Sequence, residues 1–206
     1  MNDLACRDLI QAVERASSPA QLVSAVQALV ASGEAAAIPT LIAVLGYNNP
    51  VAAVAAVDGL VSFGAVAVQP LMEQLDEYNY GARAYSIRAL AAIADPRAMD
   101  VLIPAAATDF APSVRRAAAK GLGSLDWNLL SGKARSHSQA LALQTLLSIL
   151  DDPDWSIRYA AVVGLSALAH SPDLRAQIQV HLKQIGDADV AVRSRLLLAQ
   201  KVLSDV

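Results

Sequence analysis

A unit that recurs about every thirty residues is the feature that most constrains the fold of this chain. In each copy an acidic residue is followed six positions later by arginine, and a further seven positions on by leucine. Copies begin at Glu77, Asp109 and Asp152, and a weaker one at Asp187 ends in Gln200. A fixed period of this length is typical of a solenoid, in which stacked units share one continuous core.

The closing residues of the units give their number and size. They are Leu29, Leu60, Leu90, Leu122, Leu165 and Gln200. The spacing is 30 from Leu60 to Leu90 and 32 from Leu90 to Leu122, whereas the interval before Leu165 is longer. We place an insertion in the polar stretch 127–139 and interpret it as a loop. The sequence therefore predicts a single domain over 1–206 with an insertion loop near 127–139.

Each unit divides into two helices, because Asn-Pro and Asp-Pro breaks interrupt apolar residues at helical spacing. The predicted fold is all-α, a right-handed α-solenoid of about six helical pairs. Its core is expected to hold the closing leucines, together with Ile87, Ile93, Val162 and Leu168. A partner is expected to dock on an exposed apolar face at one end of the solenoid, and both ends are candidates.

Composition excludes several classes of protein. A net charge of −3 argues against general nucleic-acid binding, which needs a basic footprint, and leaves room only for a local basic patch. No apolar run is long enough to span a bilayer, and the N-terminal sequence lacks the pattern of a signal peptide. Cys6 is the only cysteine, and we expect a free surface thiol. His137, His170 and His181 match no metal-ligand spacing. These features predict a cytoplasmic chain without metal.

The repeated arginines are interpreted first as structural. The unit around Leu60 has Tyr47 and Ala53 in place of the acid and the arginine, so both partners are absent together. Such pairs commonly link one helical turn to a neighbouring helix, and the planar guanidinium can hold two acceptors at once. We call this series the ladder; its members are Arg83, Arg115, Arg158 and Arg193.

A second series lies on another face of the same helices. It takes the positions three before, one after and five after each ladder arginine, which share a helical face roughly 200° from the closing leucine. Successive units place there Pro50, Val54, Asp58; Tyr80, Ala84, Arg88; Pro112, Arg116, Lys120; Trp155, Tyr159, Val163; and Val190, Ser194, Leu198. We call these residues the stripe.

The stripe combines aromatic rings with cations, which suits a planar conjugated ligand bearing carboxylates. The rings of Tyr80, Trp155 and Tyr159 would stack on the ligand. Its carboxylates would pair with three cations, which are Arg88, Arg116 and Lys120. Asp58 could face pyrrole-type N–H donors. A solvated polar face and a surface that grips a partner protein are the alternatives.

No catalytic constellation is visible in the sequence. There is no Ser-His-Asp pattern, no cysteine with a plausible histidine partner and no phosphate-binding glycine loop. His137 falls in the expected insertion loop, where a catalytic role has little support.

Four blocks of sequence resemble the E/F-type phycobilin lyases. They are EYNYGARA at 77–84, IRAL at 87–90, DPRA at 95–98 and DFAPSVRRAAAKGL at 109–122. The similarity extends from about Ile38 to Leu168, and the length and block spacing are similar to those of the F, or beta, subunits of this family. The resemblance implies HEAT-like repeats.

The resemblance also implies a function. Such lyases are heterodimers of an E and an F subunit that attach phycocyanobilin to a cysteine of the phycocyanin alpha subunit through a thioether bond. The product serves light harvesting in the phycobilisomes of cyanobacteria and red algae. The bilin would be a substrate, and no permanently bound cofactor is implied. Asp58 becomes the candidate for orienting or protonating a pyrrole nitrogen, unless the E subunit supplies that group.

One departure from the family refines this expectation. Members that also isomerise the bilin carry an Asn-His-Cys-Gln type stretch, whereas residues 78–81 here read YNYG, with no His or Cys. The resemblance therefore implies attachment without isomerisation. Two other hypotheses stay open, which are a bilin or phycobiliprotein chaperone that performs no chemistry and a plain HEAT scaffold.

Overall fold

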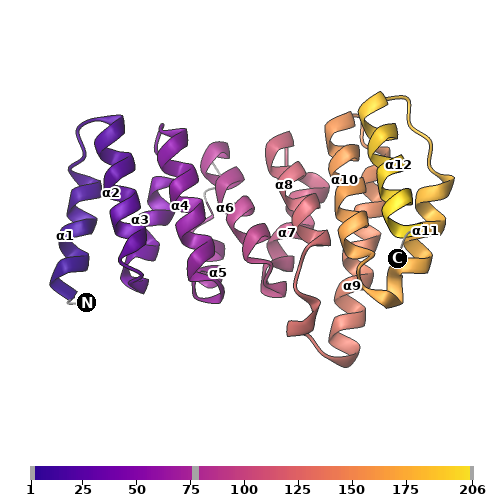
Figure 1. Cartoon of the computed structure of the whole chain (residues 1–206), viewed down its shortest axis with the longest axis horizontal. Coiled ribbons are helices and arrows are strands. Elements are labelled where there is room, and N and C mark those ends of the chain that lie inside the picture. Colours follow the sequence, from indigo (N-terminus) through magenta and orange to yellow (C-terminus); the bar gives the residue numbers. More distant parts are fainter. Residues whose placement is uncertain (1–2, 76–78, 205–206) are drawn as a thin grey trace. The chain divides into compact units, whose positions relative to one another are not determined.

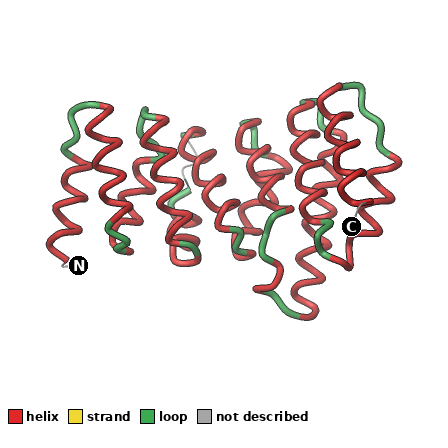
Figure 2. Tube along the Cα trace, viewed as in Figure 1, coloured by secondary structure: helices red, strands yellow, loops and turns green. Residues whose placement is uncertain are grey.

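The computed structural model describes residues 3–75 and 79–204, which contain twelve α-helices, four short 3-10 helices and no strand. Figure 2 shows this all-helical content, which confirms the predicted class. The helices form six consecutive pairs. By its internal contacts the chain divides into two compact units, 1–93 and 94–206. The copy of the unit that begins at Glu77, and the sequence YNYG at 78–81, lie partly outside the described residues.

The N-terminal unit holds three helical pairs, coloured indigo to magenta in Figure 1. Its helices are α1 (Asp3–Glu14), α2 (Pro19–Ala31), α3 (Ile38–Val44), α4 (Pro50–Phe63), α5 (Ala65–Glu73) and α6 (Tyr80–Ile93), with the 3-10 helix η1 (Ala35–Ala37) before α3. The second helices of successive pairs pack against one another, α2 on α4 and α4 on α6.

The C-terminal unit repeats this plan. Its helices are α7 (Met99–Thr108), α8 (Pro112–Gly123), α9 (Gly132–Ser148), α10 (Trp155–Leu168), α11 (Pro172–Gln184) and α12 (Val190–Ser204), with η2 (Pro96–Ala98), η3 (Trp127–Leu129) and η4 (Ile149–Asp151) in the connections. Helix α10 lies between α8 and α12 and contacts both. The second helices of this unit therefore form one layer, which carries the candidate site.

Local sequence explains where the second helices begin. Pro50 and Pro112 occupy the first turns of α4 and α8, where no backbone hydrogen bond is lost. The Asn49 side chain caps α4 by accepting from the Ala52 amide, and Asp154 caps α10 by accepting from the Ser156 amide. The start of each helix sets its phase, and so decides which residues face the core.

The core matches the predicted series closely. Every closing leucine is fully buried, as are Ile87, Val162 and Leu168. Ile93 was expected in the core but is only half-buried, because it is the last residue of α6. Gln200, in place of the last leucine, is also half-buried, and its amide donates to the Leu182 carbonyl at 2.6 Å. Gln200 thus provides a hydrogen-bond donor for a backbone carbonyl near the end of α11 instead of joining the core.

The prediction of a loop over 127–139 is wrong. After the short η3, helix α9 begins at Gly132 and continues through most of that stretch, so His137 is an exposed helical residue. Gln139 is buried in it and donates to the Ser171 hydroxyl at 2.9 Å. The polar composition reflects a solvent-facing first half of a helix, which a short polar window does not distinguish from a loop.

The expectation for Cys6 is also wrong. Its side chain is only 3% exposed, and it lies on α1, which packs against α2. The thiol is free but buried.

Candidate functional site

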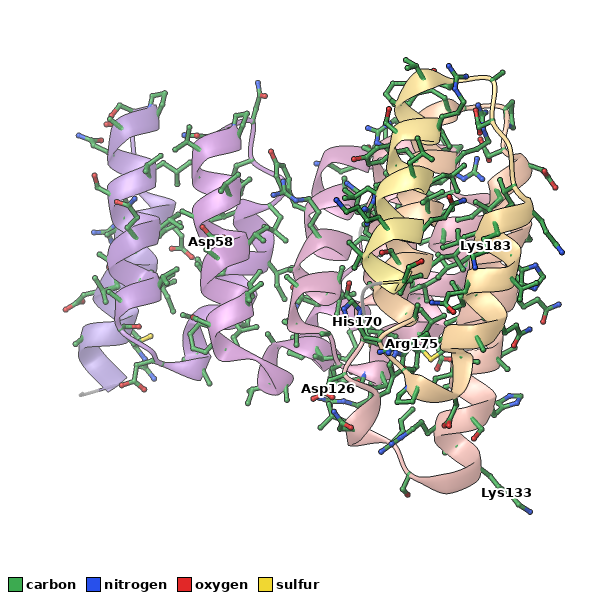
Figure 3. All side chains as sticks on the ribbon, turned by 45° about the vertical axis from the view of Figure 1, so that its right-hand side comes forward. Asp58, Asp126, Lys133, His170, Arg175 and Lys183 are labelled. Atoms are coloured by element: carbon green, nitrogen blue, oxygen red, sulfur yellow. The ribbon has the colours of Figure 1, made fainter. Side chains whose placement is uncertain are left out.

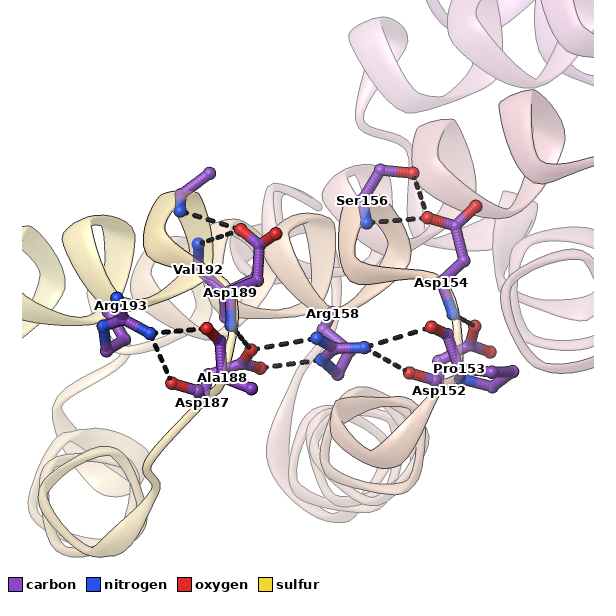
Figure 4. A network of polar contacts seen from close by, with 11 residues as sticks. Asp152, Pro153, Asp154, Ser156, Arg158, Asp187, Ala188, Asp189, Val192 and Arg193 are labelled. Atoms are coloured by element: carbon purple, nitrogen blue, oxygen red, sulfur yellow. Dashed lines mark hydrogen bonds and ion pairs between the residues drawn. The ribbon is translucent and has the colours of Figure 1, made fainter.

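The ladder arginines of the C-terminal unit join consecutive repeats. Arg158 donates from Nε and Nη2 to the two carboxylate oxygens of Asp187, at 2.7 and 2.9 Å, and from Nη1 to the Asp152 carbonyl at 2.7 Å. Arg115 forms the equivalent ion pair with Asp152. Arg115 also donates from Nε to the Ala106 carbonyl at 3.2 Å. Arg115 and Arg158 therefore each bind a backbone carbonyl and the carboxylate that begins the next unit, and Figure 4 shows this arrangement for Arg158.

Electrostatics follow from this geometry. The hydrogen bonds from Arg158 hold the pKa of Asp187 below its ordinary value, and the same contact raises the pKa of Arg158. Arg193 occupies the corresponding place in the last copy and donates from Nη1 to the carbonyls of Asp187 and Ala188, at 3.0 and 2.6 Å. In the N-terminal unit the Arg83 guanidinium lies 6.0 Å from the Tyr80 ring centroid.

Two glycines bring α8 and α10 into backbone contact. A Cβ placed on Gly123 would stand 2.0 Å from the Gly164 carbonyl oxygen, and one placed on Gly164 would stand 2.4 Å from the Ala119 carbonyl oxygen. Only glycine permits such an approach. This contact sets the separation of the two helices and hence the positions of the side chains that they present to one another.

A groove of about 650 Å³ lies between one face of α8 and the N-terminal half of α10. Its lining residues are Arg116, Lys120, Asp154, Trp155, Ser156, Tyr159 and Ala191. Four stripe residues from the sequence analysis are thus brought together, two cations from α8 and two aromatic rings from α10. Trp155 is 48% exposed, so its ring is available to a ligand, and Tyr159 is half-buried. The groove combines apolar walls with two cations, as ligand sites commonly do.

Hydrogen bonds hold one of these cations in place. Arg116 donates from Nη1 to the Ser156 hydroxyl oxygen at 3.0 Å, and that hydroxyl donates to Asp154 Oδ1 at 2.7 Å. The Ser156 hydroxyl and amide, with the nearby Arg116 charge, hold the pKa of Asp154 below its ordinary value. Asp154 is therefore a carboxylate at neutral pH, able to accept from N–H donors in the groove.

Sequence reasoning missed Asp154 and Ser156. The signal was present, because aspartate two residues before serine at the start of a helix is a capping pattern, and Asp154 adjoins the stripe residue Trp155.

The remaining stripe residues with predicted roles do not line this groove. Asp58, Tyr80 and Arg88 lie in the N-terminal unit, and all three are exposed. Figure 3 shows Asp58 on α4. The Arg88 guanidinium lies 5.5 Å from the Tyr85 ring centroid, so an aromatic neighbour already flanks it. Their proposed ligand contacts remain predictions.

A smaller hollow of about 380 Å³ lies beside η3 and the start of α11. Several of its polar groups are engaged within the protein, whereas the buried Trp127 indole N–H has no hydrogen-bond partner among the described residues. Arg135 donates to the Leu130 carbonyl, Gln139 to Ser171, and the His170 ring contacts the Ala167 carbonyl. Of the residues that the structure describes, no three or more His, Cys, Asp or Glu are placed to hold a metal ion. The described helices include none long and apolar enough to cross a membrane.

Comparison with known proteins identifies the family. A model described as HEAT repeats matches residues 68–166, and one described as PBS lyase HEAT-like repeat matches residues 22–47. The phycocyanobilin lyase subunit beta of Nostoc sp. PCC 7120 is 60% identical over 195 residues, which are 94% of this chain and 98% of that protein. This chain belongs to the family of phycocyanobilin lyase beta subunits. The resemblance that the sequence blocks carried is thereby confirmed.

Two further relatives of this lyase family agree. The phycocyanin alpha phycocyanobilin lyase CpcF of Synechocystis sp. PCC 6803 is 54% identical over 161 residues, covering 78% of this chain and 75% of that protein. A chain in the solved structure of the complex of CpcE and CpcF of phycocyanin lyase from Nostoc sp. PCC 7120 is 63% identical. It has a TM-score of 0.79 and covers 81% of this chain and 99% of its own length. The all-α solenoid of HEAT-like repeats is confirmed by these matches.

Proposed function

We propose that this chain is the F-type subunit of a heterodimeric lyase that attaches phycocyanobilin to a cysteine of the phycocyanin alpha subunit in the cytoplasm. The groove between α8 and α10, with its two cations and two aromatic rings, is the observation that carries this proposal. Support for the partner comes from the 63% identical chain, whose structure is that of a complex of CpcE and CpcF. Support for the acceptor comes from the relative named as a phycocyanin alpha phycocyanobilin lyase.

The groove suits the shape and charge of a bilin. Phycocyanobilin is an open-chain tetrapyrrole, flat and apolar, with two propionates on one edge. Its pyrrole rings would stack on Trp155 and Tyr159, and its propionates would pair with Arg116 and Lys120. The Asp154 carboxylate, held at the mouth of the groove by Ser156, would accept pyrrole N–H groups. Arg116 is fixed by Ser156 before the ligand arrives, which reduces the entropy lost on binding.

The chemistry explains why the chain supplies no nucleophile. The thiolate of the acceptor cysteine adds to the ethylidene of ring A, so one C–S bond forms, the double bond becomes single and the bilin takes up one proton. The contribution of this subunit is positioning, which can lower the barrier by roughly 7–11 kcal/mol in favourable cases. Asp154 is a poor proton donor because its pKa is lowered. We therefore keep Asp58, or a group of the E-type subunit, as the proposed residue that orients or protonates a pyrrole nitrogen of the bilin.

Attachment without isomerisation is part of the proposal. Its support is the sequence YNYG at 78–81, which has neither the His nor the Cys of the isomerising type. An attached bilin with the absorption of a phycoviolobilin adduct would contradict it.

Bilin transfer in a purified system tests the proposal. The chain, its E-type partner, phycocyanobilin and apo-phycocyanin alpha should yield a red-absorbing adduct that survives denaturation. The double variant Arg116→Ala/Lys120→Ala should lower the transfer rate by about 10²-fold, on the basis of one or two lost charge-assisted contacts. The matched control is Lys133→Ala/Lys183→Ala, which removes two exposed lysines outside the groove (Figure 3).

The outcomes separate the competing functions. Equal transfer by the groove variant and the parent would remove the groove from the mechanism. Bilin binding without a covalent product would favour the non-catalytic chaperone, and the absence of both would favour a plain HEAT scaffold.

A further inference from the structure

The first and last helices of the chain expose different surfaces. The exposed side chains of α1 from residue 5 onward are polar or small, namely Arg7, Asp8, Gln11, Ala12 and Glu14. By contrast, α12 exposes four large apolar side chains, which are Val190 (67%), Leu197 (66%), Leu198 (52%) and Val202 (41%). Repeat proteins close their ends with helices that are polar on the outside. Helix α1 has this character, and α12 does not.

A comparison between repeats shows what the outer face of α12 lacks. The position four residues after the ladder arginine is occupied by Ala119 in α8, Val162 in α10 and Leu197 in α12. Ala119 and Val162 are fully buried, and each lies on a helix that is followed by the second helix of the next repeat. Leu197 is 66% exposed. The register of the repeat therefore places an apolar side chain where a further helix would cover it.

The ladder gives a second, independent observation that α12 lacks a partner on its outer face within the described part of the chain. Arg158 uses Nη1 for backbone carbonyls of its own repeat and directs Nε and Nη2 to the carboxylate of Asp187 in the next. Arg193 makes the same backbone contacts through Nη1, with the carbonyls of Asp187 and Ala188. Figure 4 shows the two guanidinium groups in equivalent positions. Among the residues described, no carboxylate pairs with Arg193, so its Nε and Nη2 donors are available to a carboxylate from outside.

We infer that the outer face of α12, formed by Val190, Arg193 and Leu197, docks a helical repeat of the E-type partner subunit. That repeat brings a carboxylate onto Arg193 and an apolar helix face against Leu197, which continues the ladder and the core by one repeat. The identity of the partner rests on the proposed function. The position of the docking surface and the chemistry that it requires are inferred from the two preceding repeats, which contain α8 and α10.

Charge disfavours a contact between the α12 faces of two copies of the chain. Within its bounds α12 carries three cations, Arg193, Arg195 and Lys201, and no acid. Two α12 helices packed face to face would bring like charges together, which disfavours the contact. The neighbouring acids are engaged, because Asp187 pairs with Arg158 and Asp189 caps α12 through the Ala191 amide. A helical partner with acidic side chains would pair with Arg193 and would complement the positive charge of α12.

Binding measurements with surface variants test this inference. The dissociation constant of the complex with the E-type subunit is measured by calorimetry for the parent, Leu197→Glu and Arg193→Glu. Both variants should weaken binding by about tenfold or more, since Leu197→Glu would bury an unpaired charge in the contact and a desolvated arginine is a typical hot spot. Arg193→Ala should also reduce the dependence of binding on salt. The control is Val66→Glu on α5, which changes a side chain of similar exposure (61%) in the N-terminal unit and should bind within about twofold of the parent.

Two readouts keep the result interpretable. Far-ultraviolet circular dichroism establishes that each variant is folded, and a photo-crosslinking residue at position 197 should capture the partner subunit, whereas the same residue at position 66 should not. Parent-like binding by both α12 variants, or capture from position 66 alone, would overturn the inference. So would self-association of the chain that Leu197→Glu abolishes, because the face would then belong to a second copy.

The same samples separate this inference from the proposed function. A parent complex that forms but yields no covalent bilin adduct contradicts the lyase function, while the affinities of the variants still decide the docking face. If docking is the only defect, a saturating concentration of the partner should restore bilin transfer by Leu197→Glu to the parent rate. A parent that does not bind the E-type subunit overturns the docking inference.

Discussion

Replacing Gly123 by alanine tests whether the contact between α8 and α10 sets the geometry of the groove. The added Cβ would stand 2.0 Å from the Gly164 carbonyl oxygen and 2.5 and 2.6 Å from its carbonyl carbon and Cα. Because ordinary contact begins at 3.4 Å, the two helices must separate locally by about 1.4 Å, the difference between 3.4 and 2.0. All three neighbouring atoms are backbone, so no side-chain rotation relieves the clash.

The expected cost follows from this overlap. Overpacking a close-packed interior costs about 1–3 kcal/mol, and the displacement here places Gly123→Ala near the upper end. Little is regained from helix propensity, because Gly123 is the last residue of α8. Gly164→Ala lies in the interior of α10, where alanine recovers up to about 1 kcal/mol, so its net destabilisation should be smaller.

Two measurements check this prediction. Denaturant unfolding followed by circular dichroism gives the change in the free energy of unfolding, and bilin titration gives the affinity of the groove. Separation of the helices should also lengthen the contact of 3.0 Å between Arg116 and Ser156 and weaken bilin binding. The control is Gly81→Ala in α6, where the added Cβ would meet only Asn79 Oδ1, at 3.4 Å, and stability should be unchanged or slightly raised. Parent-like stability and bilin affinity in Gly123→Ala would refute the reasoning.

Three further predictions concern the ladder and the core. Arg158→Ala should lower the free energy of unfolding by roughly 2–4 kcal/mol with or without bilin, because it leaves the buried carboxylate of Asp187 unpaired. Arg193→Ala leaves no carboxylate unpaired and should cost under about 1 kcal/mol. Equal losses in chemical denaturation would contradict the structural role given to Arg158. Since the folded-state pKa of Asp187 lies below its ordinary 3.8, its stabilisation is present above that pH and is lost as the pH falls through the lower folded value, so Asp187→Asn should flatten the acid limb of a stability-against-pH curve. Leu122→Ala should cost about 2–5 kcal/mol in thermal or chemical unfolding, and a parent-like melting temperature would count against the repeat alignment.

The outcome for the stripe shows how far a periodic sequence can be interpreted. A fixed offset from the ladder arginine selected Arg116, Lys120, Trp155 and Tyr159, which line one groove, because a helix of known phase fixes the face of every residue on it. The same offset selected Asp58, whose neighbours depend on packing that the offset does not encode. The acidic group that the structure places in the groove is Asp154.

The errors at Cys6 and at 127–139 have a related cause. Composition near a chain end or in a polar window indicates solvent exposure on average, but it does not indicate which face of a helix is covered. Cys6 is buried in α1, and Lys133, Ser136 and His137 lie on the exposed face of α9. Both positions needed the neighbouring helix to be known.

By itself the sequence determined the repeat, the helical phase of each unit and the fully buried closing leucines, because these depend on spacing along one helix and on burial of its apolar side. It also carried the blocks that assign the family. Only the tertiary structure decided that α8 and α10 touch through Gly123 and Gly164, that Arg115 and Arg158 each hold the acid of the following repeat, and that Leu197 is exposed. These features arise between helices, where separation and register depend on the packing of side chains from distant parts of the chain.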